Sequence, residues 1–228
     1  MDTCRAGKRK LAEKAMKMTH FSRISVMIGA VLLALSGPVR ADYRAGVDAF
    51  EARDYALALD ELLPIAKQGH VEAQTLLGTL FRTGLVGNQD FMTAEMWFLE
   101  AAAQDDPSAH YNLGMMYFQN EKMPPGVHDK AEAARAAVDH FQQAASLGHV
   151  RAQLYMGHFY AKGKVVERDP VEAYKWYQLA AWNRNSLAST ARDQLAARLT
   201  PKQMAEAKKR ARDWEPKGKK NRARVSAK

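Results

Sequence analysis

Apolar residues recur at three- and four-residue steps along most of the chain after residue 44, and this spacing predicts a succession of amphipathic helices. In one stretch, Ala73, Leu77 and Phe81 follow one another at four-residue steps and therefore fall on one stripe of a helix. The same spacing returns in two later stretches. The helices are therefore predicted to repeat as a unit.

The repeated unit begins with the pattern A-x3-[LM]-G-x2-[FY]-x2-[GN], and its internal spacing is identical in three copies. The copies are Ala73, Leu77, Gly78, Phe81 and Gly84; Ala109, Leu113, Gly114, Tyr117 and Asn120; and Ala152, Met156, Gly157, Tyr160 and Gly163. A second motif follows each copy and starts at Trp97, His140 or Trp176, with Tyr177 beside the last. Two motifs per unit predict a pair of helices.

The glycines of the first motif have two predicted roles. Glycine inside a helix costs about 1 kcal/mol relative to alanine, so we expect Gly78, Gly114 and Gly157 to lie where a neighbouring helix backbone comes close. Gly84 and Gly163 stand at helix ends, where glycine accepts the left-handed conformation that closes a helix.

Each second helix has its own start signal. Asp169, Pro170 and Glu172 offer an N-cap carboxylate, a proline at the first position and the glutamate of a capping box, and Asp129 with Glu132 repeats that box. The middle repeat is longer than the others, and its spacings predict three extra loop residues and four extra helical ones. Four residues are close to one turn of about 3.6, so the apolar face stays nearly in phase.

These motifs resemble the SLR family, the Sel-one-like repeats, a branch of the tetratricopeptide-like α/α solenoids. The resemblance implies an all-α, right-handed solenoid of helical hairpins, with repeats at about 71–106, 107–149 and 150–182 and a degenerate first hairpin at about 44–69. A face with Leu187, Ala191 and Leu195 and a capping box at Thr200 predict a C-terminal capping helix pair over 183–215. A disordered basic tail is expected at 216–228.

The positive charge belongs to the two ends of the chain. The net charge is +9, which divides into +6 for residues 1–41, −5 for 42–200 and +8 for 201–228. The acidic repeat body and a tail without large aromatics make nucleic acid an unexpected partner. Weak contact of the tail with an anionic membrane surface is the milder expectation.

The N-terminal segment has the pattern of a secretory signal. Arg23 precedes an uncharged run from 24 to 36, and small residues lead to a cleavage point predicted after Ala41. An uncleaved membrane anchor is the alternative, and translation could start at Met1, Met16 or Met18. The single cysteine, Cys4, precedes the run, so the mature chain would hold none, which suits a periplasmic location.

The sequence contains no recognisable motif of a catalytic, metal-binding or phosphate-binding site. The histidines lack metal-ligand spacing, no G-x-S-x-G is present and no glycine-rich phosphate loop occurs, so no catalytic residue, metal or cofactor is expected. His70 and His149 occupy equivalent sites, where we expect rings that bond at a helix start. A pair of carboxylates brought together in space, from Glu95, Glu100, Glu167 or Glu172, stays open.

First-helix positions that change type between repeats are candidates for a concave binding face. The predicted partner-binding residues are Gln74, His110, Tyr111, Met115, Phe118, Gln153 and His158. Among them Tyr111, Met115 and Phe118 form either an exposed patch for a partner or a patch that the longer middle repeat covers.

The leading hypothesis is a secreted or periplasmic, non-enzymatic adaptor that binds a protein or peptide on the concave face of its repeats. The SLR resemblance carries part of that step, since fold does not fix function. The alternative is a cell-wall hydrolase that uses carboxylates and His158, or a wall-binding protein.

Overall fold

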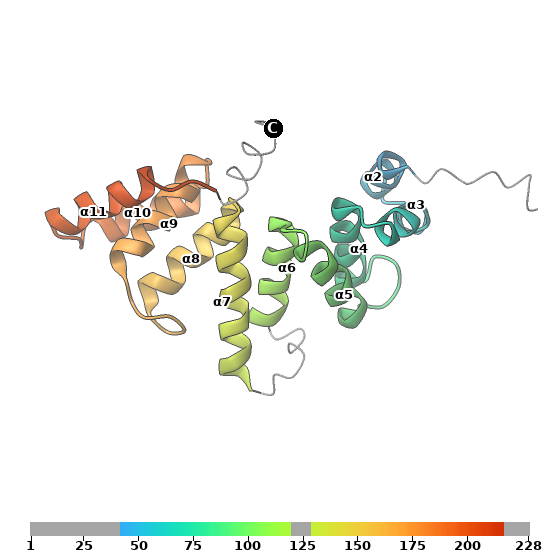
Figure 1. The fold of residues 1–228 in the computed structure, drawn as a ribbon, viewed down its shortest axis with the longest axis horizontal. Helices are drawn as coiled ribbons and strands as arrows, with labels where there is room; N and C mark the ends of the chain where they lie inside the picture. The colour runs from blue at the N-terminus through green and yellow to red at the C-terminus, as the bar shows by residue number, and fades with distance from the viewer. Residues whose placement is uncertain (1–41, 120–128, 217–228) are drawn as a thin grey trace, which may run out of the picture. The chain divides into compact units, whose positions relative to one another are not determined.

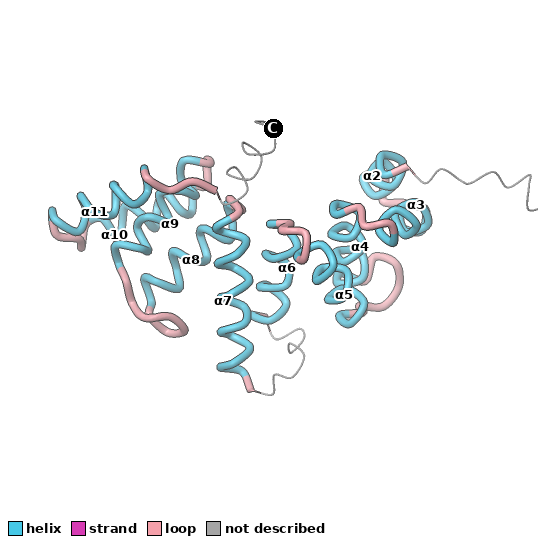
Figure 2. The backbone as a smooth tube through the Cα atoms, in the orientation of Figure 1, coloured by secondary structure: helices cyan, strands magenta, loops and turns pink. Residues whose placement is uncertain are grey.

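A computed structural model describes residues 42–119 and 129–216, and every regular element within them is a helix (Figures 1 and 2). The helices are α2 (Tyr43–Glu51), α3 (Tyr55–Lys67), α4 (Val71–Thr83), α5 (Phe91–Ala102), α6 (Pro107–Phe118), α7 (Lys130–Ser146), α8 (Val150–Lys162), α9 (Pro170–Trp182), α10 (Ser186–Ala196) and α11 (Pro201–Arg212). None of these helices is long and apolar enough to cross a bilayer. The predicted signal, Asn120, the extra loop residues before residue 129 and the tail beyond 216 lie outside the described residues.

The helices pack as consecutive hairpins. Helix α2 packs on α3, α4 on α5, α6 on α7 and α8 on α9, while α3, α5 and α7 each also contact the first helix of the next hairpin (Figure 1). This arrangement confirms the predicted α/α solenoid class. Helix α7 has 17 residues against 12 in α5 and 13 in α9, so the extra helical turn of the middle repeat is present.

Short polar side chains start the helices. Aspartate is the N-cap of most of them, and its carboxylate accepts backbone N–H bonds that would otherwise have no partner; these residues are Asp42, Asp54, Asp90, Asp106, Asp129 and Asp169. The capping box predicted at Thr200 is present in full. At Asp169 only the aspartate caps the helix, because Glu172 instead bonds to Lys175 and Arg210.

The helix-interior glycines face aromatic rings, which corrects the prediction of a close helix backbone. A Cβ at Gly78 would lie 2.6 Å from the ring of Phe98, and one at Gly114 would lie 3.0 Å from Phe141. Tyr177 approaches Gly157 in the same way. Each ring comes from the second helix of the same hairpin, so the glycine makes room for its own partner helix. Gly84 and Gly163 close α4 and α8 with φ of 72° and 69°, as predicted.

The core lies between the helices of each hairpin and between hairpins. The repeated alanines Ala73, Ala109 and Ala152 are buried, as are Trp97, Tyr117, Trp176 and Tyr177. Phe81 and Tyr160 are partly buried and pack against the core. Small alanines and large aromatic side chains together therefore fill the core of the repeats.

The last two helices both pack on α9. Ala188 of α10 is buried there, but Leu187 is 69% exposed, so the predicted apolar face of α10 is wrong at its first position. Helix α11 buries Ala207 and Ala211, and beyond its end Trp214 packs edge-on against Trp176 with 6.3 Å between ring centroids.

Candidate functional site

Two of the predicted partner-binding residues are buried and form hydrogen bonds inside the solenoid, so they are not exposed on the surface as predicted. Gln74 donates through Nε2 to the carbonyl of Ala66 at 3.0 Å, and Gln153 donates to the carbonyl of Ala145 at 3.4 Å. Both bonds tie the start of one hairpin to the end of the helix before it. His110 occupies the equivalent position in the middle repeat. We therefore interpret the change from glutamine to histidine there as a difference in packing.

His110 and His140 form a half-buried pair between α6 and α7. Their Nδ1 atoms are 3.1 Å apart, so one ring donates and the other accepts. Burial lowers the pKa of His140 to about 4, with help from the charge of His110, and burial also lowers the pKa of His110. His110 is thus engaged inside its own hairpin.

Tyr111 stacks on the histidine that caps the next helix. Its ring lies 4.4 Å from that of His149, and Tyr43 stacks on His70 at the same distance. Both histidines accept the backbone N–H three residues on through Nδ1, at 3.4 Å for His70 and 3.2 Å for His149, as expected for rings at a helix start. Tyr111 is therefore part of a repeat junction.

Phe118 belongs to a group of rings, Phe118, Phe141, Tyr155 and Phe159, called here the aromatic cluster. Phe141 and Tyr155 stack with centroids 4.8 Å apart, and Phe118 meets Phe159 edge-on at 5.7 Å. Helix α8 thus covers most of the patch predicted on α6, and Met115 packs half-buried beside it. Phe118 remains 42% exposed.

A pocket of about 400 Å³ opens beside the cluster and is called here the Phe118 pocket. Its apolar walls come from Phe118 and α8, and its rim carries two exposed lysines; the lining residues are Phe118, Tyr155, His158, Phe159, Lys162, Lys164 and Val165. A concave apolar site of this size with a few polar groups on its edge is typical of a binding site.

His158 lines this pocket as an uncharged side chain. Burial and the charge of Lys162 lower its pKa, and its Nδ1 lies 2.8 Å from the hydroxyl of Tyr177, whose pKa burial raises to about 12. The positive charge at the rim therefore comes from Lys162 and Lys164. Sequence reasoning named Phe118 and His158 but missed the lysines, although Lys162 and Lys164 flank the helix-ending glycine of the third repeat.

Two of the four carboxylates left open as catalytic candidates, Glu95 and Glu172, have structural partners. Glu95 is buried and accepts the hydroxyl of Tyr117 at 2.7 Å, while Glu172 pairs with Lys175 and with Arg210 at 3.3 Å. Among the described residues, no group of three or more His, Cys, Asp or Glu is placed to hold a metal ion.

A family model for the Sel1 repeat matches residues 71–106, 107–149 and 150–181. The chain is a Sel1-repeat protein. A crystal structure of a Sel1 repeat protein from Oxalobacter formigenes agrees with it at a TM-score of 0.57 and 27% sequence identity, over 64% of this chain and 58% of the other.

Curated relatives share the repeats within longer proteins. The chitin synthase regulator SKT5 of Saccharomyces cerevisiae is 33% identical to this Sel1-repeat protein over 59% of the chain and 19% of the relative. The alginate biosynthesis protein AlgK of Azotobacter vinelandii is 30% identical over 61% of the chain and 30% of the relative. The match thus spans less than a third of either relative.

Proposed function

We propose that this Sel1-repeat protein is a non-enzymatic adaptor that binds a protein partner at the Phe118 pocket. The observation that carries the proposal is the exposure of Phe118 at the edge of an apolar pocket, on top of a cluster whose other rings are largely buried. Exposed aromatic side chains over a concave apolar site are typical of the anchor points of protein interfaces.

The chemistry of the pocket favours one kind of partner. The apolar walls fit a large apolar side chain, and the two rim lysines favour acidic residues beside it. The ordered cluster beneath Phe118 is already packed, so binding would cost little side-chain ordering on this protein.

The cellular setting is part of the same proposal. The N-terminal pattern up to Ala41 supports export, and the names of two relatives, a chitin synthase regulator and an alginate biosynthesis protein, both refer to polysaccharide production. We therefore place the partner in the cell envelope. Fractionation with N-terminal sequencing should find the mature chain in the periplasm beginning at Asp42; a cytoplasmic chain that keeps residues 1–41 would contradict this setting.

Photo-crosslinking in cells tests the binding site. A p-benzoylphenylalanine residue placed at Phe118 should crosslink one protein that the same residue placed at Leu57 does not. Leu57 is a matched control because it is an apolar side chain with 47% exposure on a different hairpin. Crosslinks that are equal at the two positions would contradict a site at the Phe118 pocket.

A further inference from the structure

Gln153 carries a buried hydrogen-bond acceptor for which the described residues supply no partner. Its side chain is 0% exposed, its Nε2 donates to Ala145, and its Oε1 accepts nothing. A buried acceptor without a partner loses the hydrogen bond that it would make to water, and such atoms are rare in folded proteins. The position of Gln153 therefore needs a donor from elsewhere.

The first repeat shows which donor fits this position. Gln74 is the counterpart of Gln153 and donates to Ala66 in the same way. Its Oε1 accepts an N–H from Gln104 at 2.9 Å, and the same Nε2 of Gln104 lies 3.2 Å from the carbonyl of Gly69. The carboxamide of Gln104 thus completes the first repeat.

In the third repeat, the carboxamide at the equivalent position does not bond to Gln153. Asn183 stands 79 positions after Gln104, the same interval that separates Gln74 from Gln153, but its side chain is one methylene shorter. Its Nδ2 donates to the carbonyl of Leu179 at 2.9 Å, within its own helix end. The amide that Gln104 brings to Gln74 has no counterpart at Gln153.

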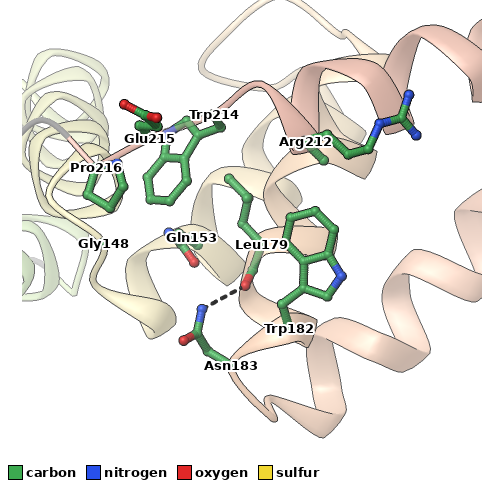
Figure 3. Close-up of a pocket in the computed structure, with 10 residues that line it drawn as sticks. Gly148, Gln153, Leu179, Trp182, Asn183, Arg212, Trp214, Glu215 and Pro216 are labelled. Atoms are coloured by element: carbon green, nitrogen blue, oxygen red, sulfur yellow. Dashed lines mark hydrogen bonds between the residues drawn. The ribbon is translucent and has the colours of Figure 1, made fainter. Parts of the chain in front are cut away.

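A pocket of about 610 Å³ lies at this position. In Figure 3, Gln153 lies between Asn183 and Trp214, Leu179 separates Trp214 from Trp182, and Arg212 points away. Gly148, the counterpart of Gly69, is at its edge. Indole and leucine walls suit the methylene stem of a side chain whose polar end reaches Gln153.

We propose that this pocket, called here the Gln153 pocket, binds the carboxamide of a glutamine side chain from the partner. The glutamine would donate to Gln153 Oε1 as Gln104 donates to Gln74. A neutral amide fits better than an ammonium group, because Gln153 offers a carboxamide oxygen rather than a carboxylate to a buried charge. The source of the glutamine rests on the adaptor function proposed above.

Titration of the full-length chain with N-acetylglutaminamide, followed by NMR, tests the pocket without the partner. We expect the indole N–H signals of Trp182 and Trp214 and the side-chain amide of Gln153 to shift. N-acetylglutamate amide has nearly the same shape but no donor at its ionised carboxylate, so it should bind roughly tenfold or more weakly. A negative result here would not contradict binding at the Phe118 pocket, because that site is tested by a different experiment, the crosslinking at position 118.

Two variants make the test selective. Asn183→Gln should supply the missing amide from within the chain, raise the melting temperature and abolish the probe-induced shifts. Gln104→Asn is the matched control, since it shortens the side chain by one methylene, withdraws its amide from Gln74 in the first repeat and should leave the shifts at Trp182 and Trp214 intact. Shifts of equal size with both probes, shifts that persist in Asn183→Gln, or no shift with either probe would overturn the proposal.

Discussion

At the scale of single residues, the glycine in the first helix of each of the three full repeats is matched to one ring. Gly78, Gly114 and Gly157 face Phe98, Phe141 and Tyr177, and in the degenerate first hairpin Gly46 faces Leu62. The sequence pattern alone shows that the glycine recurs and that an aromatic recurs later. It cannot show that the two meet, because that depends on how the hairpin closes.

This contact predicts a specific cost for a single methyl group. Gly78→Ala should lower the free energy of unfolding by about 1–3 kcal/mol, because the new Cβ overlaps the buried ring of Phe98. Urea denaturation followed by circular dichroism measures this cost. In the Phe98→Leu background the same substitution should cost much less, and an unchanged cost there would show that the ring is not responsible.

The capping histidine His149 predicts a pH dependence of stability. Burial and the charge of Arg151 hold its pKa at about 4 in the folded chain, below the usual 6.5. The unfolded chain therefore takes up a proton first as the pH falls. Stability from this group is fully present above pH 6.5 and declines by at most about 1.4 kcal/mol per pH unit between 6.5 and 4.

His149→Asn isolates that contribution, since asparagine also caps helices but does not titrate in this range. We expect the free energy of unfolding of this variant, measured in urea at pH 7.5 and pH 5, to fall by about 1–2 kcal/mol less than that of the wild type. Equal losses in the two proteins would mean that His149 binds its proton equally well folded and unfolded.

At the scale of helices, the start signals predicted at Asp129, Asp169 and Thr200 and the closing glycines Gly84 and Gly163 are confirmed. Aspartate caps, prolines at first positions and closing glycines act locally, so their effect is visible in a few residues. Exposure depends on neighbours far away in the chain, which is why Gln74 and Gln153 were expected on the surface and are buried. The cover that α8 gives to Tyr111 was missed for the same reason.

The C-terminal helix α11 is held by two kinds of contact, ion pairs of Arg210 and the packing of Trp214 on Trp176. Arg210 bonds to Glu206 at 2.9 Å and to Asp169 at 3.5 Å, but it is largely exposed, and exposed ion pairs contribute about 0–1 kcal/mol. Trp214 packs on the buried Trp176 instead. The indole contact should therefore matter more than the ion pairs.

Hydrogen exchange followed by mass spectrometry compares the two contacts. We expect Trp214→Ala to speed amide exchange across Pro201–Arg212 more than Arg210→Ala does, with α4 to α7 unchanged in both variants. A larger effect of Arg210→Ala would contradict this expectation and show that the ion pairs of Arg210 stabilise α11 more than the Trp214 contact does.

At the scale of the whole molecule, the repeats build a scaffold on which a few departures from the pattern form sites. Phe118 stays exposed over an apolar pocket, and Asn183 leaves Gln153 without its internal donor. The family resemblance predicts the scaffold, but it cannot locate these sites, because each depends on which side chains are replaced and what then surrounds the gap.

The affinity of the partner crosslinked at position 118 tests the central claim most directly. Lys162→Glu with Lys164→Glu reverses the charge at the rim of the Phe118 pocket, and Lys202→Glu with Lys208→Glu makes the same change at exposed positions of α11. Isothermal titration at physiological salt should give a dissociation constant at least about tenfold higher for the first pair and unchanged for the second. Equal affinities of both variants and the wild type would contradict binding at the Phe118 pocket.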